Sequence, residues 1–142
     1  MRLPDVNLLL YAVDATSPRH AAAKAWLESR LSGTETVGFA WVTLLGFLRI
    51  SSRASVFTDP LTPEQSFGLV TAWLARPNVV TLDPTTGHAA TMAGLLRPLG
   101  MARNLVTDAH LAALAIEHGA TLDSCDHDFG RFAGLRWEDP LA

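Results

Sequence analysis

Lysine and cysteine are both almost missing from this chain of 142 residues: Lys24 is its only lysine, and Cys125 is its only cysteine. A single cysteine excludes an internal disulfide and fits a reducing compartment. The near-absence of lysine argues against chemistry that needs a lysine beside a phosphoryl group, because Lys24 falls within an early predicted helix.

Positive charge and long apolar runs are also scarce. The formal net charge is −3, so the chain lacks a general basic surface, and any RNA contact needs a local patch and bridging cations. The N-terminal apolar run is short, is interrupted by Asp5 and Asn7, and lacks a cleavage signal. No segment approaches the ~20 apolar residues that span a bilayer. We therefore expect a soluble, cytoplasmic protein with no membrane partner.

The composition is that of a globular protein, with 49% hydrophobic and 18% charged residues. Apolar periodicity and turn residues predict strands that alternate with helices. The predicted strands are residues 2–5, 36–41, 79–82, 120–124 and 135–138. The predicted helices are residues 7–13, a helix opened by Ser17 and Pro18, and residues 43–50, 62–75, 86–96 and 108–118. This alternation predicts an α/β fold with a largely parallel sheet, in one domain over residues 1–142.

Three of these helices begin with capping signals. Ser17 is predicted to cap the second helix. Thr62 and Gln65 form a capping-box pattern, with a proline at the first helical position. Thr107 is predicted to cap the helix at 108–118, which a glycine then ends.

The predicted core includes one face of the second helix and the aromatic residues. Tryptophan is more often a core residue than a stacking platform for RNA bases, so we assign all four to the core: Trp26, Trp41, Trp73 and Trp137. Helical spacing places further residues near one face of the second helix: Ala22, Ala25 and Leu27 beside Trp26. Four histidines are scattered on predicted helices and are interpreted as surface or hydrogen-bonded residues: His20, His88, His110 and His118.

Several aspartates fall at one edge of the predicted sheet. Asp5 ends the first strand, Asp126 follows a later strand, and Asp108 stands in the first turn of a helix that begins at that edge. Ligands of open α/β sheets bind outside the carboxyl ends of the strands. Asp128 lies two residues beyond Asp126. We therefore expect these four aspartates to converge, although they span most of the chain.

Clustered carboxylates repel one another unless a cation holds them, and hard oxygen ligands select Mg²⁺ or Mn²⁺. Such an ion can polarise a phosphoryl oxygen and generate hydroxide, which is the chemistry of a phosphodiesterase. Each aspartate also has a purely structural interpretation: Asp5 as a helix cap and Asp108 as a charge that stabilises a helix N-terminus. Asp126 and Asp128, like the neighbouring Asp123, can be turn residues. Their shared location favours the metal site.

Other phosphate and metal sites fit the sequence less well. The acidic segment 123–130 has its carboxylates at relative positions 1, 4 and 6, which is not the spacing of a calcium loop. Cys125 and His127 have no second Cys/His pair at a spacing suited to zinc. Receiver domains and haloacid-dehalogenase phosphatases need a lysine near the phosphate, and the phosphatases need an aspartate where this chain has Asn7. No glycine-rich phosphate loop is present in the sequence.

Three segments together resemble the PIN-domain ribonucleases, and within them the VapC toxins of bacterial toxin–antitoxin pairs. The segments are Asp5-Val-Asn7 followed by LLLYAVD, the stretch NLVTDAHLAALAI from Asn104, and Ser124-Cys-Asp126-His-Asp128-Phe. The likeness covers essentially the whole chain, and the order and spacing of the segments make it specific.

The resemblance implies a PIN-like three-layer α/β/α sandwich and Mg²⁺- or Mn²⁺-dependent endoribonuclease activity on structured RNA, such as tRNA or an rRNA loop. It also implies a homodimer and a cognate antitoxin that covers the site and neutralises the enzyme. By position, the catalytic metal ligands are expected to be Asp5, Asp108 and Asp126, with Asp128 as an accessory ligand. Asn7 and Thr107 are expected to orient these ligands.

One residue departs from the family pattern. The family places a glutamate in the middle helix a few residues before an arginine, whereas this chain has Gly46 before Arg49. The missing carboxylate is expected to weaken metal binding, to favour one ion over two, or to be replaced by water. The alternative function is therefore a PIN-like module that binds RNA or protein with weak or no nuclease activity. For Arg49, an RNA phosphate, the antitoxin and an aspartate are all candidate partners.

Overall fold

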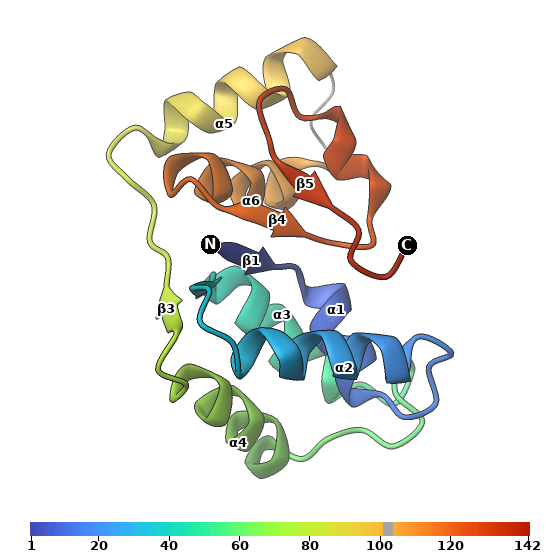
Figure 1. The fold of residues 1–142 in the computed structure, drawn as a ribbon. Coiled ribbons are helices and arrows are strands. Elements are labelled where there is room, and N and C mark those ends of the chain that lie inside the picture. Colours follow the sequence, from blue (N-terminus) through green and yellow to red (C-terminus); the bar gives the residue numbers. More distant parts are fainter. Residues whose placement is uncertain (101–103) are drawn as a thin grey trace.

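The computed structural model describes residues 1–100 and 104–142. A five-stranded sheet, in the order β3-β2-β1-β4-β5, forms the middle layer, and every strand pairing in it is parallel. The strands are short: β1 (Arg2–Pro4), β2 (Val37–Phe39), β3 (Val79–Thr81), β4 (Thr121–Asp123) and β5 (Trp137–Glu138). Because β1 lies between β2 and β4, the first strand of the chain pairs with a strand near its end (Figure 1).

Helices cover both faces of this sheet (Figure 1). One face carries α1 (Val6–Val13), α2 (His20–Leu31), α3 (Trp41–Ser51) and α4 (Pro63–Leu74). The other carries α5 (His88–Leu96) and α6 (Val106–Glu117), and two 3₁₀ helices follow α5 and β4, η1 (Arg97–Leu99) and η2 (His127–Arg131). The layers confirm the predicted three-layer α/β/α fold. Within the described ranges, no helix is long and apolar enough to cross a membrane.

A separate apolar core fills each side of the sheet. Successive side chains of a strand point to opposite faces of the sheet. Leu3 and Leu122 belong to the core on the side of α6, and Val37 and Phe39 belong to the core on the side of α1–α4. Helix α6 is buried over most of its surface, from Ala109 to Ala115, as expected for a helix that is apolar nearly all round. Each fully buried leucine or phenylalanine contributes about 1.5–3 kcal/mol through the hydrophobic effect.

Two of the three predicted capping residues do not cap their helices. Thr62 and Gln65 form the complete capping box, as predicted. Ser17 instead accepts a hydrogen bond from the backbone N–H of Arg19 at 3.1 Å, so it stabilises the turn before α2, and the helix begins only at His20. Helix α6 begins one residue before Thr107, with Leu105 as its N-cap and no side-chain capping bond.

The predicted core was wrong at several positions. On α2, the buried residues Ala23, Leu27 and Leu31 repeat every four residues, which leaves both Ala22 and Ala25 exposed. Trp73 is buried against Phe47, with ring centroids 4.9 Å apart. Trp41 begins α3 rather than ending a strand and is 46% exposed. Trp26 and Trp137 are only partly buried.

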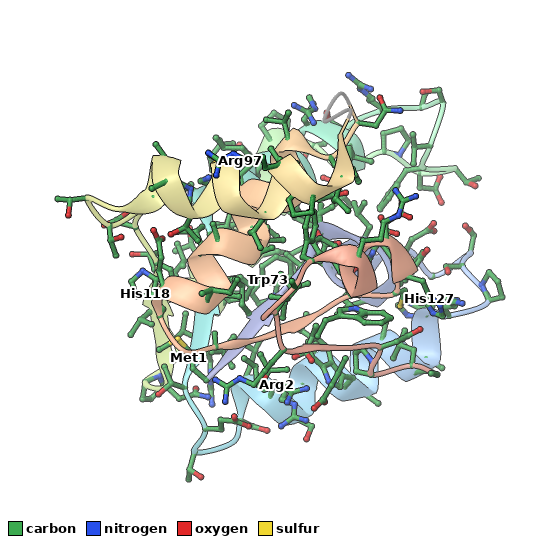
Figure 2. The ribbon with its side chains drawn as sticks, turned by 90° about the horizontal axis from the view of Figure 1, so that it is seen from above. Met1, Arg2, Trp73, Arg97, His118 and His127 are labelled. Carbon is green, nitrogen blue, oxygen red and sulfur yellow. The ribbon has the colours of Figure 1, made fainter. Side chains whose placement is uncertain are left out.

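An ionic network, buried at Arg2 and Asp123, joins three neighbouring strands. Arg2 of β1, labelled in Figure 2, donates from Nε to Asp123 Oδ2 of β4 at 2.9 Å and pairs a second time with the same carboxylate. It also donates to Glu138 Oε2 of β5 at 2.6 Å. The Asp123 side chain is 0% exposed, so the strand residue Asp123 is a structural partner of Arg2 and not a turn residue.

Candidate metal centre

Three elements bring the predicted aspartates to the carboxyl edge of the sheet. Asp5 follows β1 directly and is the N-cap of α1. Asp126 follows β4 and is the N-cap of η2. Asp108 lies in the first turn of α6. All three line one open cleft of about 410 Å³. The convergence predicted from the order of strands and helices is therefore present for three of the four aspartates.

Both carboxylate oxygens of Asp5 are held by hydrogen bonds. Oδ1 accepts the backbone N–H of Val6 at 2.7 Å. Oδ2 accepts Ser124 Oγ at 2.7 Å and Asn7 Nδ2 at 3.2 Å. The side chain therefore caps α1 and at the same time presents a fixed carboxylate to the cleft, so the structural and the functional interpretation of Asp5 are compatible.

Ser124 is the centre of the polar network under the cleft, and the sequence reasoning gave it no role. It is fully buried. Its hydroxyl donates to Asp5, accepts Asn7 Nδ2 at 3.0 Å and accepts the backbone N–H of Asp126 at 3.0 Å. The sequence does carry a signal for this role: Ser124 is a small hydroxyl residue directly after a buried strand and two residues before Asp126.

Asn7 has the geometry of an orienting residue, whereas Thr107 does not. Asn7 donates to Asp5 and to Ser124 from Nδ2, and its Oδ1 accepts the backbone N–H of Cys125 at 3.4 Å. It thereby joins α1 to the segment after β4. Thr107 lines the cleft but is exposed, and its side chain makes no hydrogen bond within residues 1–100 and 104–142.

The carboxylates of the cleft repel one another. Burial, followed by the charges of Asp5, Asp126 and Asp128, raises the pKa of Asp108 to about 6. Burial also raises the pKa of Asp5, against the lowering effect of the Ser124 and Val6 hydrogen bonds and with a further rise from Asp126. Such mutual repulsion is what a bound cation relieves.

The donor set fits a hard divalent cation, but the ligands are not closed around one. Carboxylate oxygens suit Mg²⁺ and Mn²⁺, and three of them face the same space. Among the residues described, no group of three or more His, Cys, Asp or Glu side chains is arranged so that it could hold a metal ion. Mg²⁺ commonly keeps several waters and takes only one or two carboxylates directly, so the open arrangement is compatible with it.

Asp128 and Cys125 lie at the margin of the site. Asp128 is exposed and lies 4.0 Å from Arg131 Nε, and it is not part of the cleft lining; its charge still acts on Asp108. Burial, with the nearby charge of Asp139, raises the pKa of Cys125 to about 11. The thiol is therefore neutral at pH 7 and is neither a nucleophile nor a ready metal ligand.

Gly46, where the sequence comparison led us to expect a fourth acid, lines the cleft. It is buried on α3 and faces the same space as Asp5 and Asp108. A Cβ added at Gly46 would meet only Val6, at 3.5 Å, which is ordinary van der Waals contact. The backbone therefore accepts a side chain there, and its absence leaves open space in the cleft.

The family assignment agrees with this geometry. The PIN domain family model matches residues 2–135. The chain therefore belongs to the PIN-domain family, as its three segments had indicated.

Its relatives within that family are VapC proteins. Ribonuclease VapC37 of Mycobacterium tuberculosis is 49% identical over 142 residues, which is 100% of this chain and 99% of the relative. Ribonuclease VapC33 of the same organism is 44% identical over 141 residues, 99% of both chains. A crystal structure of VapBC2 from Rickettsia felis, bound to a DNA fragment from the promoter, has the same fold, with a TM-score of 0.70 at 19% identity over 96% of each chain.

Proposed function

We propose that this protein is a Mg²⁺- or Mn²⁺-dependent endoribonuclease and the toxin of a toxin–antitoxin pair. The observation that carries the proposal is the convergence of Asp5, Asp108 and Asp126 on one cleft. There burial, followed by the charges of the neighbouring aspartates, raises the pKa of Asp108. Full-length relatives named ribonuclease VapC support the reaction. The carboxylate donor set supports a hard cation.

Each residue of the site has a distinct part in this proposal. Asp5, Asp108 and Asp126 would hold the cation, and Asp128 would contribute through water. When bound, the ion supplies Lewis-acid stabilisation of the phosphodiester and lowers the pKa of a bound water. Asn7 and Ser124 keep the Asp5 carboxylate in place by their hydrogen bonds.

The substrate and partners follow from the same assignment. An open cleft of about 410 Å³ admits a length of exposed RNA backbone, which supports a structured RNA with an accessible loop, in the class of tRNA or rRNA. The VapBC complex among the structural neighbours supports a cognate antitoxin as the protein partner, and the family resemblance supports a homodimer. Cellular RNA as substrate implies a cytoplasmic protein.

Cleavage of RNA by the purified protein tests the proposal. Total RNA is incubated with wild type in Mg²⁺, in Mn²⁺ and in EDTA, beside the variants Asp5→Asn and Asp108→Ala. We expect discrete fragments with one of the ions, no cleavage in EDTA and none by either variant. Asp83→Ala, at an exposed loop position outside the cleft lining, is the matched control and should cut like wild type.

The alternative, a binding module without turnover, rests on the absence of an acid at Gly46. It predicts RNA binding with no cleavage in either ion. Absence of cleavage by the wild type on every RNA tried would contradict the nuclease and favour the module.

A further inference from the structure

Helix α3 presents an unusual pair of residues to the cleft. Gly46 and Arg49 both line it, and residues three apart on a helix lie on the same side. Packing does not require the glycine, because an added Cβ would make only one ordinary contact, to Val6 at 3.5 Å. A glycine inside a helix costs about 1 kcal/mol relative to alanine. The glycine that leaves open space beside Arg49 therefore lowers the stability of helix α3.

Arg49 places an exposed guanidinium group at an acidic cleft. Its side chain forms no salt bridge or hydrogen bond within residues 1–100 and 104–142, although Asp5, Asp108 and Asp126 line the same cleft. The Arg49 guanidinium therefore forms no ion pair with these aspartates and can bind an anion that enters the cleft.

We propose that the space at Gly46 and the guanidinium of Arg49 form a binding site for a backbone phosphate of the substrate RNA; this inference rests on the proposed function. Arginine binds phosphate through two parallel N–H donors and does so more specifically than lysine. A phosphate entering this cleft would be repelled by the aspartates, and a fixed positive charge on the α3 wall offsets that repulsion. The glycine at position 46 would then make room for a phosphate, where an acid would instead contribute a metal ligand.

An acid at position 46 would remove both features of this phosphate site. A glutamate there would fill the space, and it would stand three residues before Arg49, the spacing of an intrahelical ion pair. Gly46→Glu therefore separates two accounts of the site. If the glycine is only a lost metal ligand, this substitution should improve both metal binding and RNA binding. If the glycine makes room for a phosphate, it should weaken RNA binding even where it strengthens binding of Mn²⁺.

Equilibrium binding of a short fluorescein-labelled single-stranded RNA, followed by anisotropy over a range of NaCl concentrations, tests the role of Arg49. Measurements in EDTA and in Ca²⁺ keep the RNA intact. We expect Arg49→Gln to bind several-fold more weakly than wild type and to reduce the slope of log K against log [salt] by about 0.7, the value for one phosphate contact on a single strand. Arg49→Lys should keep the slope and lose part of the affinity.

A second arginine serves as the control for this experiment. Arg30 pairs with Glu35 at 3.2 Å and is not part of the cleft lining, so Arg30→Gln should bind RNA as wild type does. RNA binding by Arg49→Gln that equals wild type overturns the inference and leaves the proposed nuclease intact, even if binding of a protein partner changes. A wild type that binds no RNA in either condition overturns both.

Variants at position 46 give an independent test on the same RNA. Gly46→Glu should weaken binding at least as much as Arg49→Gln, and Gly46→Gln, which fills the space without charge, should weaken it less. Gly46→Ala favours the helix and should change RNA affinity least. Gly46→Glu or Gly46→Gln with RNA affinity equal to or above wild type overturns the phosphate site. Circular dichroism of each variant establishes that the fold is retained.

Discussion

Ser124 Oγ donates a hydrogen bond of 2.7 Å to Asp5 Oδ2, across 119 residues of sequence. The bond ties the end of β4 to the end of β1, two strands that pair in parallel. Through the same hydroxyl, Asn7 and the backbone of Asp126 join the network. The position of the first aspartate in the cleft is thus set by a residue near the end of the chain.

Removal of this hydroxyl should impair the site more than the fold. Ser124→Ala leaves Asp5 with one strong hydrogen bond fewer, and residues that orient metal ligands typically contribute 10- to 100-fold to metal affinity or activity. We expect a loss of roughly that size in Mn²⁺ affinity, with about 1–3 kcal/mol lost from the free energy of unfolding. The control Ser66→Ala removes another buried serine, whose hydroxyl, within the part of the chain that the structure describes, donates to the Pro63 carbonyl one helix turn away at 3.3 Å. Equal metal affinity in Ser124→Ala and wild type would contradict the assigned role.

Metal binding should depend on pH through Asp108. Its pKa of about 6 in the metal-free protein lies above the ordinary value, so the folded state binds this proton more tightly than the unfolded chain does. Without metal, this group therefore destabilises the fold as pH rises from about 4 through 6. A cation must displace the proton, so Mn²⁺ affinity should fall roughly tenfold per unit below pH 6.

Isothermal titration with Mn²⁺ at pH 7.5, 6.5 and 5.5 measures this dependence. Asp108→Asn should bind weakly and show little change over the same range. Asp128→Asn removes one neighbouring negative charge, so it should shift the fall in affinity to lower pH. A wild-type affinity that is constant between pH 7.5 and 5.5 would show that Mn²⁺ and a proton do not compete for the Asp108 carboxylate.

The Arg2–Asp123 pair should be essential to the fold. The Arg2 side chain is 11% exposed and that of Asp123 is 0% exposed, so Arg2→Met leaves a carboxylate buried without its partner. We expect a loss of about 3–5 kcal/mol in the free energy of unfolding, measured with urea. The double variant Arg2→Met/Asp123→Leu should recover much of that loss. The surface control Lys24→Met, at a side chain that is 57% exposed and pairs with Glu28, should change stability by less than about 1 kcal/mol. A similarly small loss in Arg2→Met would refute the role of the pair.

A histidine pair between α5 and α6 should make stability depend on pH. His88 Nε2 lies 2.8 Å from His110 Nδ1, and His88 Nδ1 lies 2.8 Å from Glu117 Oε2. Burial, and then the neighbouring His88, lowers the pKa of His110. The unfolded chain therefore binds this proton at a pH where the folded state does not, and stability should fall as pH drops through about 6.5.

The comparison of wild type with His110→Gln between pH 7.5 and 5.5 isolates this effect, because other titrating groups are common to both proteins. The variant should lose less stability on acidification than wild type. His127→Gln, at a histidine side chain that is 75% exposed, is the control and should follow wild type. Parallel stability curves for wild type and His110→Gln would contradict this account.

The sequence patterns alone predict the three layers of the fold and the convergence of Asp5, Asp108 and Asp126. Alternating strands and helices predict a parallel sheet, and parallel strands put Asp5 and Asp126 at one edge whatever their exact lengths. Helix boundaries were less well predicted, because local hydrogen bonds decide them. Ser17 satisfies a turn instead of a helix, and Thr107 falls inside α6, after its first residue.

Sequence patterns could not predict ion pairs and hydrogen bonds between residues far apart in the chain. The Arg2–Asp123 pair joins residues 121 apart and depends on the register of β1 against β4, in which Pro4 lies opposite Asp123. The role of Ser124 depends on the same register, because only that alignment puts its hydroxyl beside Asp5 and Asn7. Neither strand carries a local signal that fixes this alignment.

The central claim is that aspartates from both ends of the chain bind one cation together. Titration of Mn²⁺ into wild type, Asp5→Asn, Asp108→Asn and the exposed control Asp83→Asn tests it most directly. We predict that wild type and Asp83→Asn bind the ion alike and that each cleft variant binds it at least about tenfold more weakly. A wild type that binds no Mn²⁺, or Asp5→Asn and Asp108→Asn variants that bind it as wild type does, would contradict the claim.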